Sequence, residues 1–192
     1  MKTIEETGKV SFSHSVKDFW QGYFDFRGQS TRAGFWWSQL CIILIYTLLF
    51  VILGIDASRR SYYDAPISPL LLFIIIVFSL AIIVPSLALF VRRLRNIGLK
   101  SKTILVLFVL YYGFYGTYII GTYSSIMSNI SSLISQYSEN YTTPVMQISS
   151  SPFITLFFMM ISGFFFISLF LPTNMLATNS KHPFLQSIFS DK

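Results

Sequence analysis

Four long apolar runs divide the chain, and each has the length of a membrane-spanning helix. The hydrocarbon core of a bilayer is about 30 Å thick and needs roughly 20 apolar residues of helix to cross it. The runs cover about residues 35–54, 69–91, 103–123 and 152–171, and none of them contains a charged residue. The pattern therefore predicts an all-α polytopic membrane protein with four transmembrane helices in a domain of residues 35–171.

Two other fold classes fit this pattern poorly. A helix of a soluble bundle carries a polar stripe, and residues 70–78 contain no polar residue that would supply one. The strands of a transmembrane β-barrel alternate in hydrophobicity, whereas these runs are apolar at successive positions. We therefore expect membrane-spanning helices.

The segment before the first run predicts a shorter, amphipathic helix. Its apolar side chains recur at steps of three and four residues, which places them on one helical face: Phe12, Val16, Phe19, Trp20 and Tyr23. Lys17, Asp18 and Gln21 fall on the opposite face. We expect an aromatic helix lying at the inner membrane surface within a cytoplasmic tail of residues 1–34. A membrane anchor is the simpler interpretation, and a gate or docking arm is the functional one.

A loop of residues 124–151 separates the third and fourth runs. It is rich in serine and contains a single charged residue, Glu139. Within it Ile126, Ile130 and Leu133 follow helical spacing, so we expect an amphipathic stretch on the outer membrane surface.

Local signals mark the ends and the interior of the runs. Ser30 or Thr31 is suited to capping the first span, and Gly28 permits a preceding turn with positive φ. Pro85 lies inside the second run, where it predicts a helix kink and frees one backbone carbonyl that must find another partner.

The distribution of positive charge predicts the orientation. Lysine and arginine number 14 against 8 acidic residues, which gives a net charge of +6. If the N-terminus is cytoplasmic, 12 of the 14 lie on the cytoplasmic side, and the loop of residues 124–151 has none. This positive-inside bias predicts an N-in, C-in protein with a cytoplasmic tail of residues 172–192. We see no cleavable signal peptide, and we expect a multi-pass protein of the bacterial inner membrane.

Several kinds of chemistry are not expected. The predicted spans contain no ionisable residue of the kind that proton-coupled transporters use. The two histidines, His14 and His182, lie in opposite tails, and Cys41 is the single cysteine, so the sequence predicts no metal site and no disulfide. We expect neither an enzyme nor a bound cofactor. We also expect no nucleic-acid binding, because the basic loop is short and held at the membrane.

Two sequence blocks resemble a known family. They are Tyr23–Trp37 (YFDFRGQSTRAGFWW) and Pro85–Gly98 (PSLALFVRRLRNIG). The chain resembles the DUF805 family of small bacterial inner-membrane proteins, whose members typically read YFDFxGRxSRxEFWW and, after a proline, RRLHDxGxSGWW. The resemblance covers roughly residues 19–107. Arg95 and Asn96 replace the family's His-Asp pair, and Leu99 begins a different continuation. The resemblance implies location and architecture, because no biochemical function is established for the family.

The two blocks place a charge cluster at the cytoplasmic interface. Its members are Asp25, Arg27, Arg32, Arg92, Arg93 and Arg95. We hypothesise that Asp25 pairs with an arginine and so clips the N-terminal segment onto the second loop. The other arginines would bind phosphates of anionic inner-leaflet lipids, because a guanidinium binds two oxygens at once. The alternative is that the arginines act only as orientation signals.

The sequence thus favours a non-enzymatic membrane protein that acts by binding anionic lipid or a membrane-protein partner. One version is an immunity protein that blocks a membrane-active toxin. The alternative is a component of a transporter or channel. A pore needs polar residues along one face, whereas the polar residues of the third run, such as Tyr111, Tyr112 and Thr117, fall on more than one.

Overall fold

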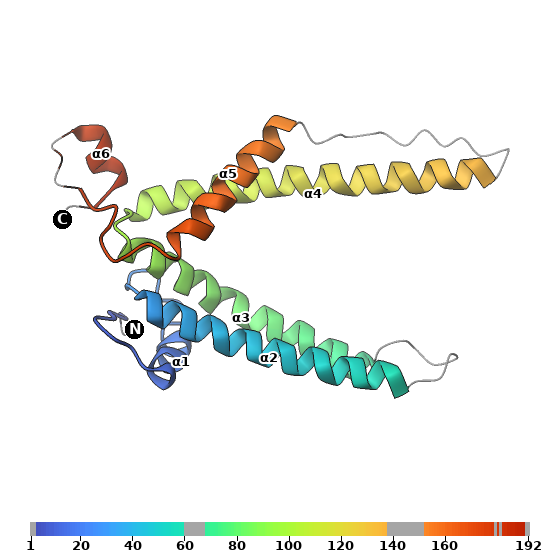
Figure 1. The fold of residues 1–192 in the computed structure, drawn as a ribbon, viewed down its shortest axis with the longest axis horizontal. Coiled ribbons are helices and arrows are strands. Elements are labelled where there is room, and N and C mark those ends of the chain that lie inside the picture. The colour runs from blue at the N-terminus through green and yellow to red at the C-terminus, as the bar shows by residue number, and fades with distance from the viewer. Residues whose placement is uncertain (1–2, 60–67, 138–151, 179, 181, 191–192) are drawn as a thin grey trace. The chain divides into compact units, whose positions relative to one another are not determined.

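The structure is a computed structural model that describes residues 3–59, 68–137, 152–178, 180 and 182–190 (Figure 1). It divides into two compact units, one of residues 1–100 and 169–192 and one of residues 101–168. All regular secondary structure in the described residues is α-helical. Two isolated β-bridges pair Glu5 with Gln29 and Leu99 with Phe189.

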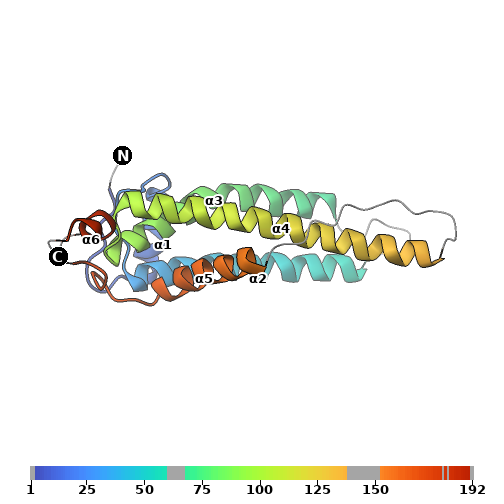
Figure 2. The same ribbon diagram turned by 90° about the horizontal axis from the view of Figure 1, so that it is seen from above.

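The first unit contains α1 (Phe12–Gln21), α2 (Arg32–Arg59), α3 (Pro69–Asn96) and α6 (Pro183–Ile188). Helices α2 and α3 lie side by side, and α1 packs against both (Figures 1 and 2). The core at this junction consists of Phe19, Phe35 and Leu89, and Ile42, Phe90 and Leu169 pack around it. The predicted amphipathic helix is confirmed as α1, but part of its aromatic face is buried against protein. Asp18, which was expected on the polar side, is buried as well.

The second unit consists of α4 (Ser101–Tyr137) and α5 (Pro152–Ser168), which pack together. Aromatic rings fill their interface. Phe108 and Phe165 have ring centroids 5.6 Å apart, and Tyr118 stacks on Phe158 at 5.2 Å. Such aromatic pairs stabilise a packed interface beyond the area that they bury.

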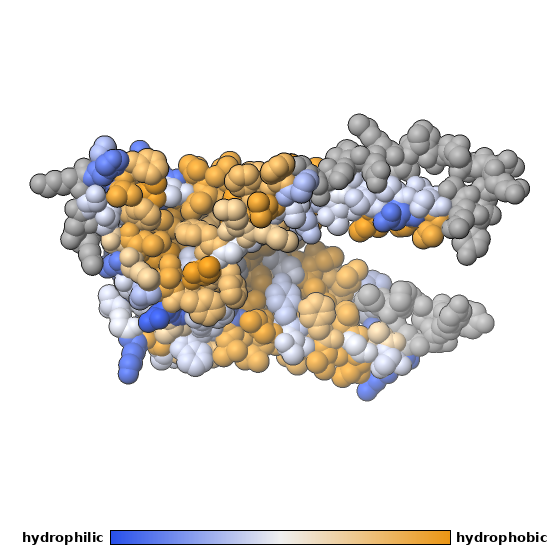
Figure 3. Space-filling view, turned by 45° about the horizontal axis from the view of Figure 1, so that its top comes forward, coloured by the Kyte–Doolittle hydropathy of each residue, from blue (hydrophilic) through white to orange (hydrophobic). Residues whose placement is uncertain are grey.

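Three of the described helices, α2, α3 and α4, are long and apolar enough to cross a membrane, which is the pattern of a multi-pass membrane protein. α5 is a shorter apolar helix of 17 residues, within the expected fourth run of residues 152–171. The helices present large apolar side chains on their outer surfaces (Figure 3). α2 and α3 also extend beyond the charge-free runs, because the flanking polar residues continue the helical hydrogen bonding.

Helix α4 differs most from the expectation. The predicted third span ended at residue 123, but the helix continues without a break to Tyr137. Residues 124–137 of the expected outer loop are therefore helical, and residues 138–151 lie outside the described part of the chain. A serine-rich sequence is typical of a loop. Here the serine hydroxyls donate hydrogen bonds to carbonyls of their own helix, as the Ser128 hydroxyl does to the Ser125 carbonyl at 2.9 Å.

Pro85 lies inside α3 and is buried. A helical proline leaves the carbonyl four residues earlier without its usual N–H donor. That carbonyl belongs to Ala81, and the Tyr23 hydroxyl donates to it at 2.7 Å. The sequence predicted that a partner was needed, and the structure supplies it from the segment after α1.

Candidate functional site

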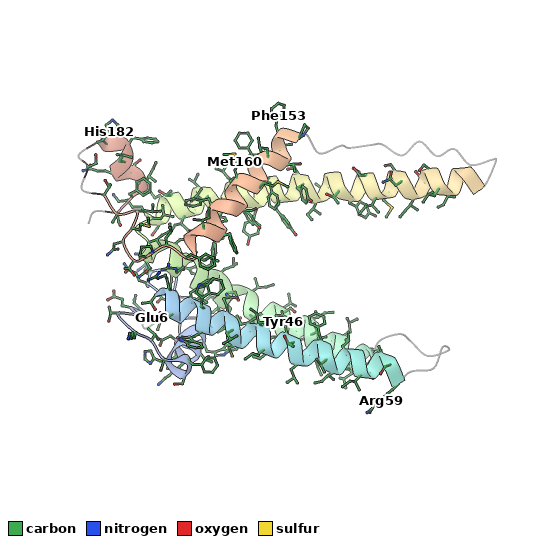
Figure 4. The ribbon with its side chains drawn as sticks, in the orientation of Figure 1. Glu6, Tyr46, Arg59, Phe153, Met160 and His182 are labelled. Atoms are coloured by element: carbon green, nitrogen blue, oxygen red, sulfur yellow. The ribbon has the colours of Figure 1, made fainter. Side chains whose placement is uncertain are left out.

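The polar groups of the first unit gather where the N-terminal arm, residues 3–10, meets the start of α2. The Gln29 N–H donates to the Ile4 carbonyl at 2.8 Å, and the Glu6 N–H donates to the Gln29 carbonyl at 3.1 Å. The arm therefore runs beside the segment that leads into α2. Figure 4 shows Glu6 near this end of α2 and Arg59 at its opposite end.

Asp25 holds the arm in place through backbone groups. Its buried carboxylate accepts the N–H of Ile4 at 2.6 Å, of Arg27 at 3.0 Å and of Gly28 at 3.1 Å. In the described part of the chain no arginine forms an ion pair with Asp25. Asp25 therefore holds the arm to the segment before α2, and these bonds do not include the second loop to which an Asp25–arginine pair was expected to clip the arm.

Gly28 serves close packing. The described glycines with positive φ are Gly8 and Gly98, so Gly28 does not adopt the positive φ that a glycine permits. A Cβ at Gly28 would lie 2.2 Å from the Ile4 carbonyl oxygen and 2.6 Å from Asp25 Oδ2. Any larger residue at this position would push the arm away from Asp25.

Glu6 completes the cap of α2. The Thr31 hydroxyl accepts the Gly34 N–H at 3.1 Å, which confirms Thr31 as a capping residue. The Glu6 carboxylate accepts the Thr31 N–H at 2.9 Å and the Thr31 hydroxyl at 3.1 Å. In a capping box, a glutamate at the third helical position accepts this N–H. Here the third helical position is Gly34, which has no side chain, and Glu6 of the arm supplies the carboxylate instead.

The space beside Gly34 shows how closely Glu6 fits. A Cβ at Gly34 would lie 1.9 Å from Glu6 Oε2, so a side chain there and the docked arm exclude each other. The family pattern given above has glutamate at this position. Burial raises the pKa of Glu6 above its usual value, and the hydrogen bonds from Thr31 oppose that shift.

Arg92 joins α3 to α1. Its side chain is fully buried, and Nη1 donates to the Asp18 carbonyl at 3.4 Å, at the C-terminal end of α1. Burial lowers the pKa of Arg92 below its usual value, and the charges of Asp25, Glu6 and Asp18 oppose that shift. The negative end of the helix dipole also favours a cation at this position. Gly22 leaves room for the guanidinium, because a Cβ there would lie 2.4 Å from Nη1. Nε and Nη2 have no hydrogen-bond partner in the described residues.

Arg93 joins α3 to the C-terminal segment. It is fully buried, and it donates to Asn96 Oδ1 at 2.8 Å, to the Leu169 carbonyl at 3.3 Å and to the Leu171 carbonyl. The expectation that Arg92 and Arg93 face lipid phosphates therefore fails, because their guanidinium groups are buried in protein contacts. The sequence shows only two adjacent arginines at the end of an apolar run. It does not show that Arg92 contacts α1 and that Arg93 contacts the C-terminal segment.

The C-terminal segment packs on the turn after α3. The Leu176 N–H donates to the Ile97 carbonyl at 2.9 Å, and the Ser190 N–H donates to the Gly98 carbonyl at 2.8 Å. Lys100 donates its N–H to the Ile188 carbonyl at 3.1 Å. Residues 172–192 were expected to form a tail, and these contacts were not predicted because backbone groups make them and no side chain marks them in the sequence.

The remaining arginines of the predicted cluster are accessible. Arg27 and Arg32 are exposed, and Arg95 is half-buried, with Nη1 3.3 Å from the Phe26 carbonyl. These three can meet a ligand from outside the protein. Arg32 is the first residue of α2 and lies one helical turn before Trp36.

An apolar groove of about 420 Å³ begins at that turn. Its lining is Ala33, Trp36, Trp37, Leu40 and Ile43. Trp36 packs on Phe170 with ring centroids 5.1 Å apart, and Trp37 packs edge-on against Phe12 at 5.9 Å. The groove and the role of Glu6 were not predicted from the sequence. The groove could have been inferred from a small residue, Ala33, on the same helical face as the tryptophans. The role of Glu6 could have been inferred from Gly34, a glycine three residues after the capping Thr31.

Comparison with known proteins agrees with the resemblance of the two blocks. A family model described as "Protein of unknown function (DUF805)" matches residues 23–174, which is most of the chain. No curated protein and no solved structure matches it. The match includes Asp25, the groove of α2, both buried arginines and the start of the C-terminal segment. The chain belongs to the DUF805 family of proteins of unknown function.

Proposed function

We propose that this chain is a non-enzymatic protein of the bacterial inner membrane that binds one anionic phospholipid at the N-terminal end of α2. The observation that carries the proposal is the position of exposed Arg32 one turn before an open, wholly apolar groove. A phospholipid has the same two parts, a phosphate at the membrane surface and acyl chains beneath it. Both termini would be cytoplasmic, so this end of α2 would meet the inner leaflet.

The chemistry of each part supports this pairing. A guanidinium forms two parallel hydrogen bonds to a phosphate, and tryptophans are favoured at the depth of the headgroups. Trp36 and Trp37 are both partly exposed, at 39% and 40%, but Phe170 and Phe12 hold their rings in place. The groove is therefore preorganised for an acyl chain, which lowers the entropic cost of binding one.

The topology within this proposal has four spans. α5 is within the range of roughly 17–25 residues that a membrane-spanning helix requires, at the short end. An even number of spans returns the C-terminal segment to the side of the N-terminal arm. This agrees with the backbone bonds that join residues 174–176 to the end of α3.

A paired substitution tests the proposal. We expect that Arg32→Gln lowers the amount of anionic phospholipid that co-purifies in polymer nanodiscs, measured by mass spectrometry against total lipid. Arg59→Gln is the matched control, because Arg59 is an exposed arginine at the other end of the same helix. Equal loss in both variants, or no enrichment in the unmodified protein, would contradict a site at Arg32. Co-purification of a stoichiometric protein without such enrichment would favour the immunity or partner-binding interpretation instead.

A further inference from the structure

The start of α1 is held by groups outside that helix. Ser11 precedes α1 as its N-cap, but the serine side chain makes no capping hydrogen bond, and the first turn contains no acidic residue. Both kinds of group commonly stabilise the first turn of a helix. Phe12, the first residue of α1, instead packs edge-on against Trp37 of α2, with ring centroids 5.9 Å apart. The position of Phe12 therefore depends on what holds the chain just before it.

The docked arm holds that part of the chain. Glu6 is bonded to Thr31 at the start of α2, and five residues, 7–11, connect Glu6 to Phe12. A connection of this length spans at most about 20 Å. Thr31 and Trp37 are six residues apart, which corresponds to about 9 Å along a helix. The arm and Phe12 therefore contact the beginning of α2 at two nearby points, and release of the arm would leave Phe12 on a free chain end.

Neither contact occupies the groove at α2. The groove lining includes Trp37 but not Phe12, so the Phe12 ring supports the tryptophan from outside the groove. Glu6 bonds to Thr31, which directly precedes Arg32. The described residues contain no ion pair between Glu6 and Arg32, so the docked arm leaves this arginine to an outside ligand. The docked arm thus supports the tryptophan and the arginine and competes with a ligand at neither.

We propose that the N-terminal arm controls lipid binding at α2, and that the docked arm favours the bound lipid. This inference rests on the proposed function, because it concerns the same groove. A groove whose tryptophan and preceding helix cap are fixed loses less conformational freedom when a lipid binds. Coupling between two binding events is reciprocal, so a bound lipid in turn stabilises the docked arm. The arm therefore acts as a strap that links the N-terminal segment to the occupancy of the lipid site.

Gly34→Ala tests the strap without altering the arm or the groove lining. The added methyl would lie 1.9 Å from Glu6 Oε2 and so displaces the arm, although alanine is the better helix former. We expect less phosphatidylglycerol, an anionic phospholipid, to co-purify with this variant in polymer nanodiscs, and faster trypsin cleavage after Lys9. Gly54→Ala in the same helix is the control, because an added methyl there meets no other group within 4 Å. Faster cleavage with unchanged phosphatidylglycerol would overturn the proposal.

Phe12→Ala tests the contact with Trp37 separately. Loss of the aromatic pair should lower the enrichment of phosphatidylglycerol by roughly two- to tenfold. Phe26→Ala is the matched control, because Phe26 is 42% exposed against 43% for Phe12 and lies outside the groove lining. Equal enrichment in these two variants, while Arg32→Gln lowers it, would show that the Phe12 ring does not support the groove and would overturn the proposal.

The reverse effect is measured by trypsin cleavage after the exposed Lys9 in nanodiscs of defined lipid. Phosphatidylglycerol should slow this cleavage relative to phosphatidylcholine in the unmodified protein and in Arg59→Gln, but not in Arg32→Gln. Equal cleavage in the two lipids, in a protein that enriches phosphatidylglycerol, would overturn control by the arm and leave the lipid site intact. Absence of enrichment in the unmodified protein would contradict the proposed function itself, and control by the arm with it.

Discussion

Two carboxylates, Asp25 and Glu6, hold the N-terminal arm by accepting hydrogen bonds from backbone N–H groups. Hydrogen bonds to a charged acceptor contribute about 1.5–3 kcal/mol each, roughly twice as much as neutral ones. Asp25 receives three of them, one of which comes from the arm itself, at Ile4. The attachment of the arm is therefore concentrated in a few side chains, and single substitutions should release it.

We expect Asp25→Ala to release the arm. Its three N–H donors would lose their acceptor, and Ile4 would lose its bond across to the segment before α2. Trypsin should then cleave after Lys9 faster than in the unmodified protein, measured in detergent micelles. Glu5→Ala is the control, because it removes the same charge from an exposed position in the same arm. Unchanged cleavage in Asp25→Ala would show that other contacts hold the arm.

Attachment of the arm should also depend on pH through Glu6. Because burial raises the pKa of Glu6 above 4.5, the docked arm binds a proton more tightly than the free arm does. Docking should therefore become stronger as the pH falls through the raised pKa, and it should stop changing below about 4.5, the unperturbed value. The mobility of a spin label on Thr7→Cys, in the Cys41→Ser background, measures this change.

The control for this pH dependence is Glu6→Gln, which keeps an oxygen acceptor for Thr31 and cannot titrate. The spin label should then show the same mobility across the pH range. A pH dependence that persists in Glu6→Gln would assign the titration to another group.

Single residues also show where the sequence analysis reached its limit. Asp25 was singled out from the sequence, but as the partner of an arginine that holds the arm to the second loop, whereas its carboxylate accepts backbone N–H groups of Ile4, Arg27 and Gly28. The burial of Arg92 and Arg93 was not predicted, because the sequence at the end of an apolar run is the same whether an arginine faces lipid or protein. Arg92 is buried where α1 meets α3, at a contact between residues 74 positions apart, and Arg93 is buried against the Leu169 and Leu171 carbonyls of the C-terminal segment.

At the scale of elements, α3 depends on a bond from outside the helix. Pro85 leaves the Ala81 carbonyl free, and the Tyr23 hydroxyl satisfies it. An unsatisfied buried carbonyl costs about 1–3 kcal/mol. The tyrosine and the proline should therefore be energetically coupled.

A double-mutant cycle measures this coupling. We expect Tyr23→Phe to lower the unfolding temperature of the otherwise unmodified protein. In Pro85→Ala the same change should cost less, because the N–H of the new alanine can bond to Ala81 within the helix. Additive effects of the two substitutions would show that the Tyr23 hydroxyl does not compensate for the proline.

The helices themselves were predicted from charge-free runs, and α2, α3, α4 and α5 all begin within a few residues of the expected positions. Their ends were harder to predict. The end of an apolar run marks where lipid contact stops, whereas a helix ends where its hydrogen bonding stops. In α4 these two points differ because serines continue the helix beyond the apolar run.

For the whole molecule, composition predicted the membrane location, whereas contacts between distant segments were not predicted. An 11% content of charged residues and 53% hydrophobic residues places the chain in a membrane, and the large apolar side chains exposed on its helices agree (Figure 3). The groove at Trp36 was not predictable, because the two tryptophans that line it pack against Phe12 of α1 and Phe170 of the C-terminal segment. Binding of an anionic lipid there is the central claim of our account.

Tryptophan quenching by brominated phospholipids tests that claim most directly. Trp20→Phe leaves Trp36 and Trp37 as the fluorophores, both of which line the groove. We expect an anionic brominated lipid to quench them more strongly than a zwitterionic one of equal bromine content. Arg32→Gln should abolish this difference, and Arg59→Gln should retain it. Equal quenching by the two lipids in the protein that retains Arg32 would contradict a lipid site at α2.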